Sequence, residues 1–408
     1  MTALCQQVFI NEKIVEKRCN FAHLYQNLIT MIFFCYSIWV SFSWVGMIIY
    51  LLINLKKIEQ LKIQPLIEAQ PAVVIIIAVR NEEDYLENAL QSVCNINYNN
   101  YRIIVVNDRS TDRTADILQG FIAHYPKLTV TTITTLPDEW LGKNNALYQG
   151  YLSSSEEWML FTDADIVFHR DAVNKALGYA VKHKLDHLTI LPEAISRSVI
   201  LNSVLGTFGI ILMMHMKPWG AKDPKSKGFA GIGAFNLVRR DAYEKIGTHA
   251  RIKLRPDDDM QLGQTIKSAG LKQDVLGGQQ YICLEWYKNL KEFCNGLMKN
   301  SFSVVEYKLG HAIINALMVL VCFALPIPAM LIFGSTEIRL MAAVVFLFQI
   351  FYMVAVRPNK WWYALMIPFT SFLIVYTTLK SAFLTIRQGG IYWRDSFYSL
   401  DMLKGKRT

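Results

Sequence analysis

The chain has 408 residues, of which 52% are hydrophobic and 18% charged, and its formal net charge is +9. This composition is too apolar for two ordinary soluble domains, because the surplus is concentrated in a few runs that carry no charge. The basic surplus does not require nucleic acid, since Lys and Arg residues follow the first and last of these runs, where they can face anionic lipid headgroups.

The first uncharged run, Leu28–Ile53, is 26 residues long and can cross a bilayer about 30 Å thick. We predict a transmembrane helix over residues 28–55, preceded by an N-terminal leader over residues 1–27. A cleaved signal peptide is the alternative, but its apolar stretch is usually about 7–15 residues long. The run is therefore interpreted as a retained anchor.

The stretch that follows has the patterning of a globular α/β domain, which we predict over residues 70–310. Short β-branched runs alternate with segments in which apolar residues recur at helical spacing. The predicted strands are Val73–Val79, Arg102–Val106, Leu128–Ile133 and Trp158–Phe161, and the predicted helices include Glu82–Val93 and Thr114–His124. This alternation predicts a mostly parallel, doubly wound, Rossmann-like sheet, in which ligands bind beyond the carboxyl ends of the strands.

One apolar segment lies inside this domain, at about residues 195–216, and contains polar residues such as Arg197 and Asn202. We predict that it is an interfacial helix lying against lipid, where it would guide a lipid acceptor toward the site. A buried core helix explains the segment almost as well.

Three further uncharged runs follow the domain: Ile313–Phe333, Leu340–Val356 and Trp361–Leu379, of 21, 17 and 19 residues. They predict two or three transmembrane helices over residues 313–383, and the shortest run, Leu340–Val356, is the one expected to be re-entrant or interfacial. The basic tail, residues 384–408, is predicted to lie at the membrane surface. Its segment Gly389–Arg394 is interpreted as an aromatic interfacial anchor, with a cover over the site as the alternative.

Polar clusters follow the predicted strands at the edge where ligands are expected. Asn107–Asp112 comes directly after a strand, and Asp108 is a candidate to accept hydrogen bonds from a nucleobase or ribose. A turn in which Ser110 or Asp112 caps the next helix explains the same residues about as well.

Asp163 and Asp165 follow another predicted strand, separated by one alanine. Alternate carboxylates past a strand can hold one hard cation, and this arrangement suits Mg²⁺ or Mn²⁺ bound to a diphosphate. Alone, the spacing is weak evidence, because Asp is common in turns.

Asp257, Asp258 and Asp259 precede a segment with Leu262 and Ile266 at helical spacing. Acidic residues at a helix N-terminus compensate the helix dipole, but three in a row exceed what capping requires. Close like charges raise the pKa of one carboxyl group, which would prepare a general base.

Five strings occur in order along the domain: Ala78-Val79-Arg80-Asn81-Glu82, Val106-Asn107-Asp108-Arg109-Ser110-Thr111-Asp112, Leu141-Gly142-Lys143-Asn144-Asn145-Ala146-Leu147, Asp163-Ala164-Asp165 and Asp258-Asp259-x-x-Leu262. In that order they resemble family 2 glycosyltransferases of GT-A fold. With one span before the domain and several after it, the layout is similar to ceramide glucosyltransferases and to bacterial transferases associated with hopanoids and carotenoids.

The resemblance implies an inverting transfer from a nucleotide-sugar, usually a UDP-sugar. Asp108 and Asp112 match the positions that bind the nucleoside, and Lys143 lies in the segment near the nucleotide. Asp165 matches the carboxylate that binds the metal, with Asp163 beside it as a second contact to metal and substrate.

The resemblance also assigns the reaction to two neighbouring carboxylates. Asp259 matches the catalytic base, with Asp258 in the position usually held by Glu, and the base would deprotonate the acceptor hydroxyl that attacks the anomeric carbon. Gly231 and Gly233, in the segment Gly228–Phe235, match a part of the family that lines the acceptor side of the substrate site.

Family synthases that extend polysaccharides carry a Gln-x-x-Arg-Trp string after the base, and this chain has none. We therefore favour transfer of a single sugar to a membrane lipid hydroxyl over a processive polysaccharide synthase. A catalytically silent membrane scaffold that binds nucleotide-sugar is the remaining alternative, which the intact Asp108, Asp165 and Asp259 disfavour. A sphingoid, a polyprenoid or triterpenoid, and a diacylglycerol are all compatible acceptors.

The domain of this multi-pass protein is expected to face the cytoplasm, at a bacterial inner membrane, because nucleotide-sugars are made in the cytosol. Four spans would then put both termini on the opposite side, whereas positive-inside bias would keep the basic tail in the cytoplasm. The sequence leaves this conflict open. Seven scattered cysteines, with no C-x-x-C pair, support neither a disulfide framework nor a zinc site and suit a reducing compartment.

Overall fold

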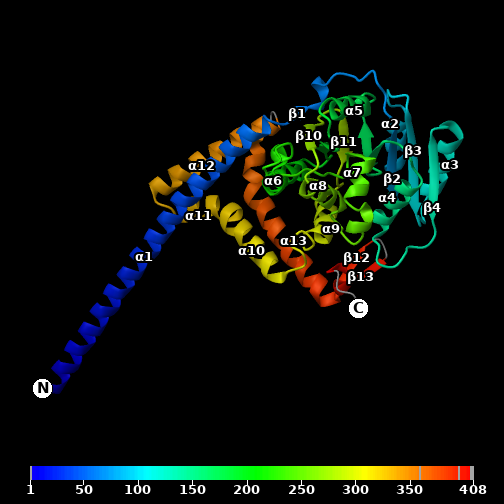
Figure 1. Cartoon of the computed structure of the whole chain (residues 1–408). Helices are drawn as coiled ribbons and strands as arrows, with labels where there is room; N and C mark the ends of the chain where they lie inside the picture. The colour runs from blue at the N-terminus through cyan, green and yellow to red at the C-terminus, as the bar shows by residue number, and fades with distance from the viewer. Residues whose placement is uncertain (1, 358–359, 394–395, 405–408) are drawn as a thin grey trace. The chain divides into compact units, whose positions relative to one another are not determined.

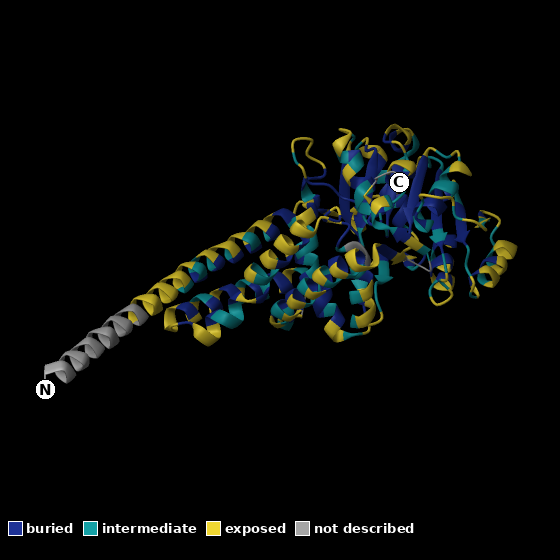
Figure 2. Cartoon of the chain, turned by 90° about the horizontal axis from the view of Figure 1, so that it is seen from below, coloured by how far each residue is buried: buried dark blue, intermediate teal, exposed yellow. Residues whose placement is uncertain are grey.

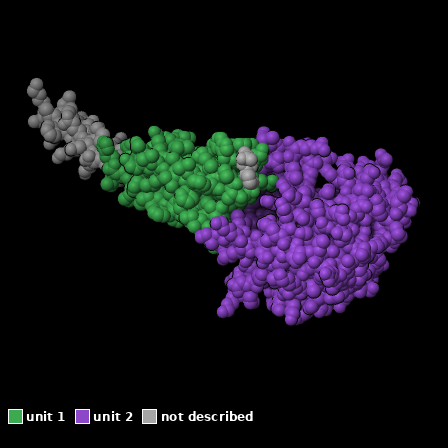
Figure 3. Space-filling model, turned by 90° about the horizontal axis from the view of Figure 1, so that it is seen from above, with its two compact units in different colours: residues 1–52, 318–372 green, residues 53–317, 373–408 purple. Residues whose placement is uncertain are grey.

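The computed structural model describes residues 2–357, 360–393 and 396–404. The chain divides into two compact units (Figure 3): residues 1–52 with 318–372, and residues 53–317 with 373–408. The second unit contains the predicted α/β domain, and the first contains apolar helices. Three basic residues of the predicted interfacial tail, Arg394, Lys406 and Arg407, lie outside the described residues.

An eight-stranded mixed sheet forms the centre of the α/β unit (Figure 1). The strand order is β1-β10-β7-β9-β5-β2-β3-β4, and neighbouring strands are parallel except where β9 pairs with β5 and β7. The strands are β1 Glu59–Gln60, β2 Val73–Val79, β3 Tyr101–Asp108, β4 Leu128–Ile133, β5 Trp158–Thr162, β7 His187–Leu191, β9 Asn236–Arg239 and β10 Gln273–Gly277. The predicted fold class, a mostly parallel α/β sheet with apolar helices beside it in the sequence, is confirmed.

Helices cover both faces of this sheet: α2 Leu86–Cys94, α3 Thr114–His124, α4 Gly142–Leu152, α5 Ala172–Lys182, α7 Arg240–Lys245 and α8 Asp258–Ser268. In β2, Val73, Ile75 and Ile77 pack in one cluster with α2, α3 and α5. Val74 and Ile76 point to the other face and pack with α4, α7 and α8. A strand buried on both faces reads as a continuous β-branched run, and the central strands β2, β3 and β5 are accordingly buried throughout most of their length (Figure 2).

The helix predicted over Glu82–Val93 begins four residues later, at Leu86. The backbone N–H groups of residues 81–83 donate hydrogen bonds to the side chains of Ser110, Thr114 and Asp112. The first N–H groups of a helix have no partner within it, and here the neighbouring loop supplies acceptors for them. The Leu86 N–H donates to the Glu82 carbonyl at 3.0 Å, so residues 82–85 form a turn that leads into the regular helix.

A second, three-stranded sheet and a hairpin complete the strands of the α/β unit. The sheet has the order β6-β11-β8, and the hairpin pairs β12 with β13. These strands are β6 Ile166–Phe168, β8 Glu193–Ile195, β11 Ile282–Glu285, β12 Gly390–Trp393 and β13 Ser396–Ser399. The remaining helices of the unit are α6 Val199–Met216, α9 Leu290–Asn300, α14 Leu400–Leu403, most of α10 Leu309–Val319 and the larger part of α13 Ile367–Gln388.

The helical unit contains most of α1 Thr2–Leu55, a π-helical turn Leu320–Ala324, α11 Pro326–Phe333, α12 Thr336–Val356 and a 3-10 helix Trp361–Met366. On α1, the Tyr36 hydroxyl and the Trp44 indole N–H donate to the carbonyls of Val321 and Cys322, at 2.6 and 2.8 Å. A π-helical turn disturbs the regular backbone bonding. These two side chains therefore satisfy carbonyl groups that lipid could not hydrate.

The predicted span Ile313–Phe333 is bent by 49° between Leu309–Ala324 and Pro326–Phe333. Proline has no N–H to donate and its ring clashes with the preceding turn, so a straight helix cannot continue through Pro326. The run expected to be re-entrant, Leu340–Val356, belongs instead to the continuous 21-residue helix α12. The irregular run is therefore Ile313–Phe333, and the run Leu340–Val356, which was expected to be irregular, is a continuous helix.

By length and composition, four helices of the described chain could cross a bilayer, and the bent pair would be a fifth. They are His23–Leu55, Val199–Gly220, Thr336–Val356 and Trp361–Gln388. Three of the four, together with the bent pair, coincide with the predicted spans. The fourth contains α6, which we predicted to lie at the interface.

Candidate active site

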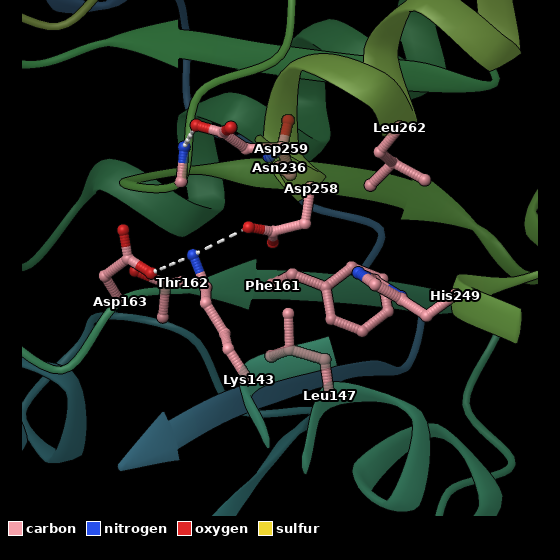
Figure 4. Close-up of a pocket in the computed structure, with 11 residues that line it drawn as sticks. Lys143, Leu147, Phe161, Thr162, Asp163, Asn236, His249, Asp258, Asp259 and Leu262 are labelled. Atoms are coloured by element: carbon pink, nitrogen blue, oxygen red, sulfur yellow. Dashed lines mark hydrogen bonds and ion pairs between the residues drawn. The ribbon is translucent and has the colours of Figure 1, made fainter. Parts of the chain in front are cut away.

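A small pocket lies beyond the carboxyl end of β5, where the sheet order changes direction between β5 and β2 (Figure 4). Ligands in doubly wound sheets bind at such a switch point. The pocket is lined by Lys143, Leu147, Phe161, Thr162, Asp163, Gly233, Asn236, His249, Asp258, Asp259 and Leu262. Five of the residues predicted from the sequence therefore meet in one place: Lys143, Asp163, Gly233, Asp258 and Asp259.

Lys143 lies at the centre of this group. It is the second residue of α4, and its Nζ is 2.7 Å from Asp163 Oδ1 and 3.4 Å from Asp258 Oδ1. Burial acts to lower the pKa of Lys143, but the charges of Asp163, Asp258 and Asp259 outweigh it and raise that pKa above its usual value. The lysine is therefore a fixed positive charge among three carboxyl groups.

Asp258 and Asp259 begin α8 and have different surroundings. Asp258 is 4% exposed, and burial raises its pKa to about 7, an effect that the charge of Lys143 opposes and that of Asp259 reinforces. Asp259 is held by backbone donors, because Gly233 N–H donates to Oδ2 at 2.7 Å and Met260 N–H to Oδ1 at 2.8 Å. Burial raises the pKa of Asp259 as well. Two neighbouring carboxyls thus have different partners: Asp258 forms an ion pair with Lys143, whereas Asp259 accepts hydrogen bonds from two backbone N–H groups.

Gly231 and Gly233 let the chain pass between the carboxylates. A Cβ added to Gly233 would lie 2.3 Å from Asp163 Oδ2, and one added to Gly231 would lie 2.1 Å from the carbonyl oxygen of Asp259. Gly233 also accepts a hydrogen bond from the backbone N–H of Asp163 at 3.1 Å. Gly233 therefore bridges Asp163 and Asp259 with its two backbone polar groups, and a larger residue could do so only if the Asp163 carboxylate moved away.

Asp165 is half-buried and is not among the residues that line the pocket. Burial raises its pKa to about 7, and the charges of Asp163 and Glu82 add to that effect. In the described part of the chain, no group of three or more His, Cys, Asp or Glu residues is arranged to hold a metal ion. Two mutually repelling carboxylates still fit a Mg²⁺-type cation that takes its remaining oxygen ligands from a substrate diphosphate and water.

Asp108, the predicted nucleoside contact, is buried and already paired. Arg109 donates to both of its oxygens, at 2.7 and 3.0 Å, and Arg80 Nη1 lies 3.7 Å from Oδ2. The first turn of α4 covers the carboxylate, since a Cβ on Gly142 would lie 2.3 Å from Oδ2. A nucleobase that binds Asp108 would have to exchange with one of these arginine contacts.

Asp112, the second predicted nucleoside contact, lies outside the pocket and ties two loops together. Its Oδ1 accepts the Thr114 N–H at 3.0 Å, and its Oδ2 accepts the Glu83 N–H at 3.1 Å. Burial acts to raise its pKa, but these hydrogen bonds outweigh it and lower that pKa. The contacts match the alternative interpretation of Asp112 as a turn and capping residue.

Sequence reasoning missed Asn144 and His249. Asn144 is fully buried, and its amide donates to the carbonyls of Ile252 and Arg255, at 2.9 and 3.0 Å. It thereby holds the loop before Asp258 against α4, next to Lys143. His249 lines the pocket, and burial lowers its pKa to about 3, with the charge of Lys143 acting in the same direction. Asn144 belongs to the family-like segment 141–147, whereas no sequence pattern marks His249.

Residues 74–247 match the family model described as glycosyl transferase family 2. The match includes Asp108, Lys143 and Asp163 and ends before Asp258. The match assigns no role to single residues, so the roles that the resemblance gives to the site residues all stay predictions.

Two known proteins show the extent of similarity. The 4,4'-diaponeurosporenoate glycosyltransferase of Staphylococcus aureus (strain USA300) is 26% identical over 232 residues, which are 56% of this chain and 60% of the relative. The match thus spans less than two thirds of that relative's length. The solved structure of mannosyltransferase PcManGT from Pyrobaculum calidifontis, in complex with GDP-Man and Mn²⁺, has a TM-score of 0.55 at 15% identity and covers 85% of this chain and 98% of that chain. At that identity the likeness concerns the fold. The chain carries a glycosyltransferase family 2 domain with a GT-A-like fold.

Proposed function

We propose that the chain is an inverting glycosyltransferase that moves one sugar from a nucleotide-sugar to a hydroxyl group of a membrane lipid. The observation that carries the proposal is the buried group in which Lys143 pairs with Asp163 and Asp258 while Asp259 is held by backbone donors. This group lies at the carboxyl edge of the sheet in a family 2 domain. A UDP-sugar is the proposed donor.

Asp259 is the proposed general base. The Gly233 N–H fixes its carboxylate, and burial raises its pKa, which brings its basicity closer to neutral pH. The base accepts the proton of the acceptor hydroxyl while the hydroxyl oxygen forms a bond to the anomeric carbon. The bond from that carbon to the diphosphate oxygen breaks on the opposite side, and its electron pair leaves with the diphosphate.

Lys143 and the two aspartates after β5 are proposed to serve the donor. Asp163 and Asp165 would hold Mg²⁺ or Mn²⁺, which when bound neutralises negative charge on the leaving diphosphate. Lys143 already contacts Asp163, so its ammonium group is placed to contact the same phosphates. Asp108 is the proposed nucleoside contact. Of the predicted donor contacts, Asp112 has the weakest support, because both of its oxygens accept hydrogen bonds within the protein.

A lipid acceptor is supported by an apolar cluster beside the acidic group. Burial raises the pKa of Tyr287 to about 12, with Asp165 and Asp163 adding to the effect, so the phenol lies within reach of their charges. Tyr287 stacks on Trp286, with ring centroids 5.5 Å apart, and both pack in one cluster with α6 and α9. The S. aureus relative is named for an apolar carotenoid acid, which is compatible with such a surface.

The topology of the sheet supports the proposal that α6 does not cross the membrane. β7 precedes α6, β9 follows it, and the two strands pair directly, with His187 opposite Val238. A crossing helix would leave its ends on opposite sides of the bilayer, and the return to β9 would expose irregular backbone to lipid. With α6 interfacial and the bent pair re-entrant, the proposed spans are α1, α12 and α13, with the domain in the cytoplasm. Three crossings leave the C-terminal hairpin on the side of the domain against which it packs.

The test is transfer of radiolabelled sugar from UDP-sugars by the detergent-purified full chain, with Mn²⁺ and total membrane lipid. Wild type and Asp116→Asn, an exposed control on α3, should label a small chloroform-soluble product, and Asp259→Asn should not. Label in a high-molecular-weight polymer would overturn single transfer. Binding of a nucleotide-sugar by folded wild type with no transfer to any lipid would favour the silent scaffold. Failure to bind any nucleotide-sugar in the presence of Mn²⁺ would contradict the proposed function.

A further inference from the structure

The C-terminal hairpin of β12 and β13 has one buried and one exposed face. Its antiparallel register places Ile391 opposite Tyr398 and Tyr392 opposite Phe397. Ile391 and Tyr398 are 7% and 6% exposed, whereas Tyr392 and Phe397 are 66% and 46% exposed. Because side chains alternate along a strand, the first pair faces the protein and the second faces outward. An interfacial anchor alone would not require a buried aromatic face.

The buried face packs on the residue that starts α4. Ile391 and Tyr398 belong to one apolar cluster with Leu141, Phe302 and Tyr307. Leu141 is the N-cap of α4, two residues before Lys143, and its N–H donates to the Lys253 carbonyl at 2.9 Å. The hairpin therefore supports the backbone from which Lys143 reaches the pocket.

The first turn of α4, next to the hairpin cluster, also lies against the predicted nucleoside site. A Cβ added to Gly142 would lie 2.3 Å from Asp108 Oδ2 and 3.1 Å from Arg109 Nη2, so the first turn of α4 lies directly on that ion pair. Tyr398 also lies near Arg109, whose pKa is raised first by its hydrogen bond to Asp108 and last by the Tyr398 phenol. Tyr398 thus shares an apolar cluster with Leu141, and the next residue, Gly142, lies directly on the Asp108–Arg109 pair (Figure 1 shows the hairpin in red).

We propose that the C-terminal hairpin is part of the donor subsite, with Tyr398 as a positioning residue for the nucleoside diphosphate. Its ring holds the Leu141–Gly142 turn against Asp108 and Arg109, so that the carboxylate and the start of α4 keep the separation that the nucleotide requires. The inference rests on the proposed function, because it assumes that a nucleotide binds at Asp108. It assigns the tail a role that its interpretation as a membrane anchor does not include.

The test is titration of UDP and GDP, each with Mn²⁺, into the full chain in detergent, together with donor KM and kcat. We compare Tyr398→Ala and Tyr398→Phe with Tyr392→Ala, a matched tyrosine on the exposed face of the same hairpin. Tyr398→Ala should weaken nucleotide binding and raise donor KM roughly ten-fold, with kcat within about two-fold of wild type. Tyr398→Phe should keep wild-type nucleotide affinity, since the aromatic ring makes the contact. Tyr392→Ala should have wild-type nucleotide affinity and donor KM.

Two results would overturn the inference, and they are distinguishable from failure of the proposed function. Wild-type nucleotide affinity in a folded Tyr398→Ala variant would refute the positioning role alone. An equal loss in Tyr392→Ala would show that the hairpin acts through general stability. If wild type binds neither nucleotide, the proposed function fails and this inference fails with it. Thermal unfolding of each variant establishes that the protein is folded.

Discussion

A single methyl group at Gly233 should disable the site while leaving the fold intact. In Gly233→Ala the new Cβ would lie 2.3 Å from Asp163 Oδ2, a distance that side-chain contacts do not tolerate. Either the Asp163 carboxylate moves away from Lys143, or the backbone at residue 233 moves and weakens its hydrogen bond to Asp259. Both outcomes displace a predicted functional carboxylate.

The magnitude follows from these contacts. Overpacking a close-packed position costs about 1–3 kcal/mol, and weakening a charge-assisted hydrogen bond costs about 1.5–3 kcal/mol when it is lost completely. Because the contacting oxygen ends a flexible side chain that is 38% exposed, we expect a stability loss at the lower end of these ranges, about 1 kcal/mol. A displacement of about 1 Å in a reacting group lowers turnover by about 100-fold. The effect on kcat should therefore be much larger than the effect on stability.

The assay compares sugar transfer and thermal unfolding of Gly233→Ala with those of Gly120→Ala. Gly120 lies in α3 with no atom within 4 Å of an added Cβ, and its replacement should leave activity unchanged and stabilise the helix by up to about 1 kcal/mol. A Gly233→Ala variant with wild-type kcat would refute the role of the glycine between the two carboxylates.

Three further predictions concern pH, metal and packing. Burial lowers the pKa of His187 from 6.5 to about 4, so between these pH values the unfolded chain binds a proton that the folded chain does not, and stability falls as the pH falls. Wild type should therefore lose about 1.3 kcal/mol more stability between pH 7.5 and 5.5 than His187→Gln does. An equal loss of stability in wild type and variant over this pH range would contradict the prediction. Asp165→Asn should abolish the Mn²⁺ dependence of UDP affinity in calorimetric titrations while metal-free affinity stays the same, and an undiminished Mn²⁺ effect would argue against Asp165 as a ligand. Asn144→Leu leaves buried carbonyls before Asp258 without their donor and should cost about 3 kcal/mol in unfolding experiments and lower kcat; wild-type stability would show that the loop is held by other contacts.

The central strands of the domain were predictable because strands buried on both faces consist of consecutive apolar residues. β2 is buried on both faces, so its β-branched run marks a central strand without knowledge of its partners. β9 was missed, since its four residues carry no such run and its antiparallel place between β5 and β7 depends on contacts far apart in the sequence. The bend at Pro326 was missed although the proline was visible, because the run was judged on its apolar length.

The sequence predicted most of the charged residues that line the pocket, but neither His249 nor the way in which the charged residues pair. Spacing placed Asp163 after a strand and Asp258 before a helix, but Lys143 meets both only because α4 and α8 converge at the same sheet edge. Asp108 next to Arg109 gives no sign in the sequence that the arginine folds back onto its neighbour. Such pairings depend on tertiary packing, which the spacing of residues along the sequence does not reveal.

The most direct test of the central claim is the chemical structure of the product. We would purify the lipid made from a UDP-α-sugar and determine its mass and the configuration of its anomeric carbon by nuclear magnetic resonance. Inverting transfer by Asp259 predicts one added hexose in the β configuration. A retained α configuration, or a chain of several sugars, would contradict single inverting transfer to a lipid.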